Sequence, residues 1–198
     1  MLIKNNYPGY KVQVIFNGIE YIDDNKRQNV INLEFGLTGE KFIFISLARV
    51  SEEKGIFFMI DAAEKLLESR DNFAIVIAGY GPHFEKARAT VKERRLDNYI
   101  LMPGYRDDGD TLLRSANCFI NASSTEALSF AILEAMGAGL PIIATNVGGN
   151  PDIVNQSTGC GITVPYNDSE KLCAAMKNIM DDKALSGLMS ANSRKAIK

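Results

Sequence analysis

Short apolar runs recur along this chain, segments of helical pattern lie between them, and few folds accommodate such an alternation. Most of the runs are continuously apolar, which is typical of strands buried on both faces in a parallel sheet. The sequence therefore predicts an α/β fold, a Rossmann-like doubly wound parallel sheet flanked by helices. The predicted strands are VQVIF from Val12, FIFISL from Phe42, FAIVIA from Phe73, YILM from Tyr99, CFINA from Cys118, PIIAT from Pro141 and CGITV from Cys160.

The segments between these runs have the spacing of amphipathic helices. In the clearest one, Ile56, Met59 and Ile60 begin an apolar stripe, and charged residues lie off that stripe. No internal repeat or low-complexity linker divides the chain. Besides this segment, helices are predicted over residues 84–96, 110–116, 126–138 and 169–180.

The composition excludes several kinds of protein. Hydrophobic residues make up 46% of the 198 residues, which is enough for a packed core. With 22 basic and 24 acidic side chains, no nucleic-acid partner is expected. Cys118, Cys160 and Cys173 have apolar neighbours and no metal-site spacing, so we expect reduced core thiols. Neither a signal peptide nor a membrane span is evident, so we expect a cytoplasmic protein, and peripheral attachment of a full-length parent to a membrane stays open.

Polar loops follow the predicted strands. They read ARVSEEKG, GYGPH, PGYRDD, NASSTEALS and TNVGGNP, whereas the segments that lead into strands are plainer. Ligands of open α/β sheets bind in the crevice at the carboxyl ends of the strands. We therefore expect these five loops to line one cleft.

The stretch STEALSFAILEAMGAGLP, from Ser124, carries two carboxylates around an apolar segment. We expect Glu126 at or near a helix start, where the unpaired N–H groups of residues 127–130 form a seat for phosphate. Helix geometry then places Glu134 about 12 Å further along the axis. Because a carboxylate can accept two hydrogen bonds from a diol, a ligand with a sugar at one end, a ribose at the other and a diphosphate between them is expected.

Such a ligand also requires positive charge, which the loop ARVSEEKG supplies with Arg49 and Lys54. Other interpretations stay open for single residues. Both cations are also compatible with solvated surface charges, and Glu126 with a favourable charge at a helix N-terminus. Glu134 is compatible with a salt bridge to Arg114. The expected convergence of these loops favours the binding site.

Several motifs resemble those of glycosyltransferase family 4, the retaining glycosyltransferases of GT-B architecture. LARVSEEKG resembles the family's motif of arginine, four residues and lysine, and AGYGP its glycine turn. EALSFAILEAMGAGLPIIAT resembles its motif of glutamate, seven residues and glutamate, and GGNPDIV follows the next strand. These motifs keep the family's order and spacing over roughly residues 12–180. The resemblance implies that the chain is the C-terminal, nucleotide-sugar-binding half of a GT-B fold.

The resemblance also implies roles for individual residues. Arg49 and Lys54 would bind the diphosphate and stabilise the leaving group, and Glu126 would contact the transferred sugar, so these three are the candidate catalytic residues. The implied nucleotide-sugar-binding residues are Glu134 at the ribose, Tyr105 and Arg106 at the base, Leu128, Ser129 and Phe130 at the phosphate or sugar, and Gly79 and Gly81 in the glycine turn.

Some positions depart from the family pattern. Family members often have glycine where this chain has Ala127 and Ser129, and an acidic or small residue where it has Tyr80. These departures bear on which sugar the pocket accepts. The segment VIFNG resembles the family's interdomain hinge. Residues 1–20 are accordingly expected to form the hinge and first strand, and residues 21–198 the donor domain, with the N-terminal acceptor domain absent from this chain.

The predicted function is that of the donor domain of a retaining, hexosyltransferase-type glycosyltransferase of polysaccharide biosynthesis. Its parent would transfer a sugar from a UDP- or GDP-linked donor to a glycan or lipid-linked saccharide, and the isolated domain is expected to bind donor but transfer little. No metal or other cofactor is expected, because the doublets at 23–24, 107–108 and 181–182 fall in turns or at helix ends. His83, the only histidine, is given no catalytic role.

Two alternative functions stay open. One is a nucleotide-sugar epimerase of the same fold, against which the spacing of Arg49 and Lys54 argues. The other is a non-catalytic nucleotide-sugar-binding module. A dinucleotide dehydrogenase is disfavoured, because no G-x-G-x-x-G follows the first strong strand. The base, the sugar, the acceptor and the oligomeric state are not determined by the sequence.

Overall fold

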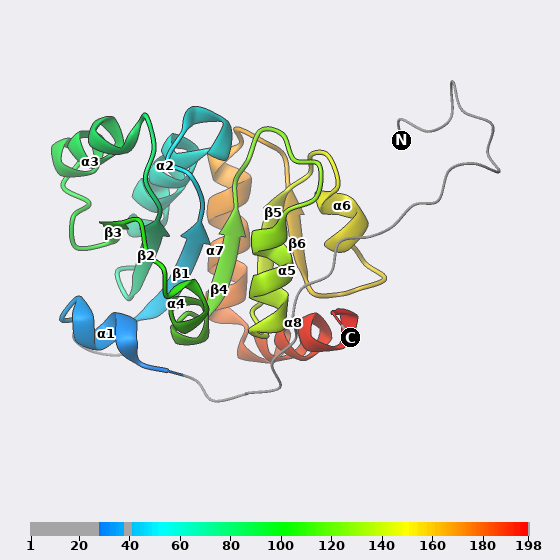
Figure 1. Cartoon of the computed structure of the whole chain (residues 1–198). Coiled ribbons are helices and arrows are strands. Elements are labelled where there is room, and N and C mark those ends of the chain that lie inside the picture. Colours follow the sequence, from blue (N-terminus) through cyan, green and yellow to red (C-terminus); the bar gives the residue numbers. More distant parts are fainter. Residues whose placement is uncertain (1–27, 38–40, 198) are drawn as a thin grey trace, which may run out of the picture.

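The computed structural model describes residues 28–37 and 41–197 (Figure 1). Within them six strands form one sheet in the order β3-β2-β1-β4-β5-β6, and every neighbouring pair is parallel. The predicted doubly wound parallel sheet is confirmed. The predicted strand at 12–16, the hinge, the doublet at 23–24 and the boundary at residue 20 lie outside the described residues. The strands are β1 (Phe42–Leu47), β2 (Phe73–Ala78), β3 (Ile100–Gly104), β4 (Cys118–Asn121), β5 (Ile142–Thr145) and β6 (Gly161–Val164).

Helices cover both faces of the sheet (Figure 1). On one face lie α2 (Ile56–Leu67), α3 (Phe84–Glu93) and α7 (Ser169–Asp181). On the other lie α1 (Val30–Glu34), α4 (Gly109–Ser115) and α5 (Phe130–Gly137). The remaining helical segments are η2 (Glu52–Lys54), α6 (Asn150–Ile153) and α8 (Lys183–Ala196).

The continuous apolar runs are explained by the two covered faces. In β1, Phe44 packs into the layer that contains α2, α3 and α7, whereas Ile43 and Ile45 pack into the opposite layer. All three side chains are at most 1% exposed. A strand buried in this way needs apolar side chains at nearly every position, which the sequence provides except at Ser46. Of the three thiols, Cys118 and Cys160 are buried as expected, and Cys173 is half-buried.

The sequence did not predict α1, η2, α6 or α8. The first three contain three to five residues, too few for a helical period to stand out. The longer α8, with the sequence KALSGLMSANSRKA, has serines and a glycine where an apolar stripe would be expected. Its N-terminus is capped by Asp182, whose carboxylate accepts a hydrogen bond from the N–H of Leu185 at 2.8 Å.

Polar contacts attach α8 to the rest of the domain. Ser190 Oγ donates to the carbonyl of Gly139, and Ser193 Oγ donates to the carbonyl of Leu140, both at 2.6 Å. Asn192 Nδ2 donates to the carbonyl of Gly159 at 3.1 Å. Gly139 and Leu140 connect α5 to β5, so α8 fixes the C-terminal end of α5.

Replacing Ser193 by alanine is expected to lower the free energy of unfolding by about 1–2 kcal/mol, because the substitution removes the donor to a buried carbonyl. Ser193 is 0% exposed. Urea denaturation of both proteins measures the difference. The matched control is Ser186→Ala on the same helix, since the Ser186 hydroxyl bonds to no described residue. Equal stability of the two variants would contradict this account of how α8 is held.

Candidate functional site

Glu126 lies in the loop between β4 and α5, and the prediction that it begins a helix is wrong. Helix α5 begins at Phe130, and Ser129 caps it by accepting a hydrogen bond from the N–H of Ile132 at 3.4 Å. Asn121 and the hydroxyl residues after it favour irregular backbone, and Asn121 Oδ1 accepts a hydrogen bond from the N–H of Ser123 at 3.3 Å. One of them, Ser124, donates through both its N–H and its Oγ to the carbonyl of Glu53. Glu126 and Glu134 therefore reach the site from two different elements, and the expected 12 Å offset along one helix does not apply.

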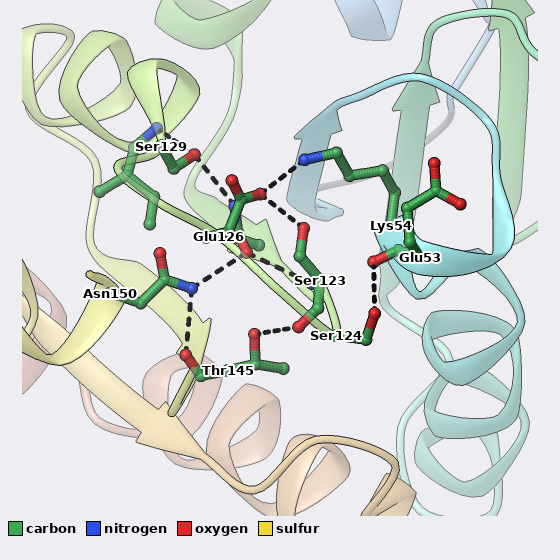
Figure 2. A network of polar contacts seen from close by, with 10 residues as sticks. Glu53, Lys54, Ser123, Ser124, Glu126, Ser129, Thr145 and Asn150 are labelled. Carbon is green, nitrogen blue, oxygen red and sulfur yellow. Dashed lines mark hydrogen bonds and ion pairs between the residues drawn. The ribbon is translucent and has the colours of Figure 1, made fainter. Parts of the chain in front are cut away.

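Lys54 and Glu126 form a direct ion pair between the loops that follow β1 and β4 (Figure 2). Lys54 Nζ donates to Glu126 Oε1 at 2.7 Å, and the two side chains are 29% and 11% exposed. Burial acts to raise the pKa of Glu126, but hydrogen bonds from Lys54, Ser123 and Asn121 outweigh it, so this pKa lies below its ordinary value. The carboxylate is therefore ionised at neutral pH.

Three glycines allow two main-chain segments to approach the Glu126 loop. Gly55, which precedes α2, has φ +67°, and a Cβ there would overlap the carbonyl oxygen of Ala122. Gly148 has φ +51°, and a Cβ there would overlap the carbonyl oxygen of Glu126. Gly149 approaches the next carbonyl, that of Ala127, in the same way. These contacts position the carboxylate by packing backbone directly on backbone.

A network of buried polar side chains supports the same loop (Figure 2). Ser123 Oγ donates to Glu126 Oε1 at 2.7 Å, and Thr145 Oγ1 donates to the carbonyl of Ser123 at 2.6 Å. Asn150 donates to Asn121 Oδ1 at 3.2 Å and to the carbonyl of Thr145 at 3.1 Å. Sequence reasoning missed this network. The available signal was a polar residue at the end of a buried strand, such as Asn121 in β4 and Thr145 in β5.

Six of the predicted site residues line one hollow of about 320 Å³, which we call the loop hollow. Its floor is formed by the carboxyl ends of β1 and β4. The N–H groups of residues 128–130 bond to no described residue, so these donors are available to a ligand. The six residues are Arg49, Lys54, Glu126, Leu128, Ser129 and Phe130.

Arg49 is the exposed cation of the loop hollow. It forms no hydrogen bond or ion pair with any described residue, and its charge contributes, after a hydrogen bond from the backbone, to the lowered pKa of Glu53. Lys54, by contrast, is already paired with Glu126. The two cations, which the sequence assigned to one task, therefore differ in how freely they can bind an anion.

The other predicted side chains line a second hollow of about 770 Å³, which we call the helix hollow. It contains Tyr105, Arg106 and Glu134, and it shares Leu47 with the loop hollow. Tyr105 is 78% exposed. Arg106 binds both carboxylate oxygens of Asp108, at 2.8 and 2.7 Å, and also pairs with Glu34. Arg106 thus connects the loop before α4 to α1.

Glu134 is exposed and pairs with no described residue. The alternative of a salt bridge to Arg114 is not observed, since no ion pair joins these two described side chains, and Arg114 donates to Asp110 at 2.9 Å. Burial of part of the side chain and then the negative charge of Asp110 raise the pKa of Glu134. Its carboxylate is available to accept hydrogen bonds from a ligand.

The glycine turn has a packing role in this structure. Gly79 has φ +152°, and a Cβ on it would overlap the carbonyl oxygen of Ala48, whereas one on Gly81 would overlap that of Val50. Neither glycine lines either hollow. They allow the loops after β1 and β2 to lie side by side, which shapes the segment that carries Arg49. His83 also lies outside both hollows.

Other candidate sites carry less chemistry. Among residues 28–37 and 41–197, no group of three His, Cys, Asp or Glu side chains could hold a metal ion. The acidic doublets that the structure describes lie at helix ends, as predicted, where Asp108 binds Arg106 and Asp182 caps α8. A hollow of about 830 Å³ lies at the opposite, amino-terminal side of the strands. No helix in the described part of the chain is long and apolar enough to cross a membrane.

This fold is that of the GT-B glycosyltransferases. The crystal structure of Anabaena HepE in complex with UDP and glucose is similar, with a TM-score of 0.77 and 19% identity, over 84% of this chain and 46% of that one. The C-terminal domain of the glycosyl transferase group 1 family protein LpcC from Francisella tularensis has a TM-score of 0.75 and 21% identity. That match covers 89% of this chain and 92% of the LpcC domain.

The chain belongs to the family described as Glycosyl transferases group 1, whose sequence model matches residues 28–196. It is 28% identical over 193 residues to the Escherichia coli UDP-Gal:alpha-D-GlcNAc-diphosphoundecaprenol alpha-1,3-galactosyltransferase. It is also 28% identical over 190 residues to the E. coli O-antigen chain mannosyltransferase C. These matches cover 94% and 93% of this chain but 49% of each relative, so the chain spans about half their length.

Proposed function

We propose that this chain is the donor-binding domain of a retaining, family 4 glycosyltransferase that uses a nucleoside-diphosphate sugar. The observation that carries the proposal is the loop hollow, where an unpaired arginine, three free N–H groups and an oriented carboxylate lie together beside the helix hollow with its second carboxylate. A diphosphate needs the first two features, and sugar hydroxyls need the carboxylates. The names of relatives that use or bind UDP-linked ligands support the same class of ligand.

The proposed roles are those that the family resemblance implies, applied to residues that line the two hollows. Arg49 and the N–H groups of 128–130 bind the diphosphate, and Glu126 accepts hydrogen bonds from hydroxyls of the transferred sugar. In the helix hollow, Glu134 binds the ribose and Tyr105 lies against the base. Lys54 holds Glu126 in the free domain and remains close enough to the loop hollow to share its charge with the phosphates.

The proposed chemistry is electrostatic. Negative charge develops on the departing diphosphate as its bond to the sugar breaks, and Arg49 and Lys54 stabilise that charge in the transition state. The proposal includes no metal, because these cations supply the positive charge. The acceptor, a glycan or a lipid-linked saccharide, binds to a further domain of the parent enzyme, which acts in the cytoplasm. The isolated chain is therefore expected to bind donor and to transfer little sugar.

The direct test is a titration of this chain with UDP, GDP, ADP and their common sugar conjugates, followed by calorimetry and by melting temperature. At 100 times its dissociation constant, a ligand is expected to stabilise the fold by about 2.7 kcal/mol. Selective binding of one nucleotide supports the proposal and names the base. A folded sample that binds none of them would contradict it. Turnover of the bound donor to a new sugar isomer without acceptor would favour the epimerase instead.

The raised pKa of Glu134 predicts that nucleotide binding weakens as the pH falls. Only the ionised carboxylate accepts two hydrogen bonds from the ribose diol, and this form is lost at a higher pH than for an ordinary glutamate. Calorimetric titrations between pH 7.5 and pH 4.5 measure the effect. Glu134→Gln is expected to bind more weakly at pH 7.5 and to show a flatter profile. If Glu134→Gln keeps the wild-type pH dependence of nucleotide binding, another group causes that dependence.

A further inference from the structure

The two oxygens of Glu126 have different surroundings. Oε1 accepts hydrogen bonds from Lys54 at 2.7 Å, Ser123 at 2.7 Å and Asn121 at 3.3 Å. Oε2 bonds to no described residue, and it is not among the buried unpaired atoms. The carboxylate is thus held by one oxygen and presents the other to the loop hollow. The two oxygens of an ionised carboxylate are equivalent, so exchanging them changes nothing, but an intermediate rotation would turn the free lone pairs away from the hollow. Whatever fixes the rotation therefore determines the geometry that a ligand meets.

Asn121 is the buried amide that reaches both this carboxylate and the cap of α5. It is 8% exposed, and its Nδ2 donates to Glu126 Oε1 and, at 3.0 Å, to Ser129 Oγ. Its Oδ1 accepts from the N–H of Ser123 at 3.3 Å and from Asn150 at 3.2 Å. The backbone donor defines which end of the amide is oxygen, so the NH₂ group must face Glu126.

We propose that Asn121 is a positioning residue that fixes the rotation of Glu126 and thereby determines how much more tightly the domain binds a nucleotide sugar than the free nucleotide. The proposal rests on the proposed function, because Glu126 must meet the donor sugar. Lys54 and Ser123 can follow a turning carboxylate, since one is a flexible chain and the other a rotating hydroxyl. Asn121 is held by three other hydrogen bonds, with Ser123, Ser129 and Asn150, and cannot follow it. Its substitution should therefore affect sugar recognition while the phosphate contacts of Arg49 remain.

Asn121→Asp tests the inference with almost no change of shape. Ser123 and Asn150 still donate to one oxygen of the new side chain, and Ser129 can donate to the other. The contact with Ser129 reverses direction, and only the contact with Glu126 is lost, because an acceptor now faces an acceptor. The charged groups around this position are Glu126 and, through it, Lys54, whereas Ser123, Ser129 and Asn150 are neutral. Protonation of the pair at lower pH supplies the missing donor again.

The experiment compares UDP with UDP-glucose and GDP with GDP-mannose by calorimetry, and uses the pair that the wild-type chain binds. In Asn121→Asp at pH 7.5, the preference for the sugar conjugate is expected to fall about tenfold or more, while the affinity for the free nucleotide changes little. Between pH 7.5 and pH 5.5 the preference should recover in this variant relative to the wild type, whose own change over this range accounts for protonation of the terminal phosphate of the free nucleotide. Asn121→Ala should lose preference without recovery, and it carries the test if the aspartate variant does not fold.

Asn155→Asp is the matched control. Asn155 also makes four hydrogen bonds, with Nδ2 donating to two carbonyls and Oδ1 accepting from Ser157 and Thr158, but it lies outside the loop hollow. The Asn155→Asp variant measures the effect of the same change from amide to carboxylate where no carboxylate partner is present. Its preference for the sugar conjugate should equal that of the wild type. If Asn121→Asp and Asn121→Ala keep the wild-type preference, the positioning role is overturned and the proposed function stands. If the wild-type chain binds neither nucleotide nor conjugate, both fail.

Discussion

Replacing Arg49 by alanine is expected to weaken the binding of nucleoside diphosphates about 10- to 100-fold. Hydrogen bonds between charged groups contribute about 1.5–3 kcal/mol, which corresponds to this range of affinity. The effect should be large because Arg49 is the exposed cation of the loop hollow and is not already paired with a carboxylate. Calorimetric titration with UDP or GDP measures the affinity.

The fold should tolerate this substitution, because an exposed side chain with no hydrogen bond to a described residue contributes little to stability. An unchanged melting temperature of the free variant would confirm that the loss concerns binding. Arg88→Ala is the control, since Arg88 lies exposed on α3 outside both hollows. If Arg49→Ala binds nucleoside diphosphates with the affinity of the wild type, the proposed contact between Arg49 and the diphosphate is contradicted.

Replacing Lys54 by methionine is expected to lower the free energy of unfolding by about 1–3 kcal/mol at pH 7. Removing one partner of a buried ion pair leaves an uncompensated charge, and partial exposure of this pair keeps the cost below that of full burial. The loss should depend on pH. In the wild type the pKa of Glu126 is lowered, so its contribution is present above the ordinary value of 4.5 and is lost as the pH falls through the folded value.

In the variant, the hydrogen bond and the charge of Lys54 no longer offset burial, so the pKa of Glu126 is higher than in the wild type. The ionised carboxylate then destabilises the fold at neutral pH, and this cost disappears when the group is protonated. The stability difference between wild type and Lys54→Met should therefore narrow as the pH falls from 7 toward 4. Urea denaturation at several pH values measures it. The double variant Lys54→Met/Glu126→Gln should recover part of the loss at pH 7, and a double variant no more stable than Lys54→Met would contradict the ion-pair explanation.

The sheet could be predicted closely because burial on both faces leaves a direct signature in the sequence. Strands β1 and β2 begin and end where the apolar runs FIFISL and FAIVIA do. The grouping of Arg49, Lys54 and Glu126 in one hollow also followed from the rule that ligand loops lie at the carboxyl ends of parallel strands. That rule needs only the order of the strands along the chain.

Contacts between distant segments could not be predicted in this way. The sequence assigned Lys54 and Glu126 to different parts of a ligand, whereas the structure pairs them across 72 residues. The start of α5 was placed four residues early, because helical spacing continues upstream of Phe130 although Ser129 caps the helix. Arg106 was assigned to the base, and no local pattern indicated that Asp108 and Glu34 would bind it. The contacts of Lys54 with Glu126 and of Arg106 with Glu34 depend on side chains that meet only after folding.

The glycine contacts around the Glu126 loop determine which positions of such a domain can be substituted. Gly55, Gly148 and Gly149 each face a carbonyl oxygen of residues 122–127 with no room for a side chain. The loop is therefore supported largely by main chain, and neighbouring side chains such as Leu128 can vary without loss of that support. New donor preferences can then arise by substitutions in the lining of the pocket, while the three glycines tolerate no replacement, not even by alanine.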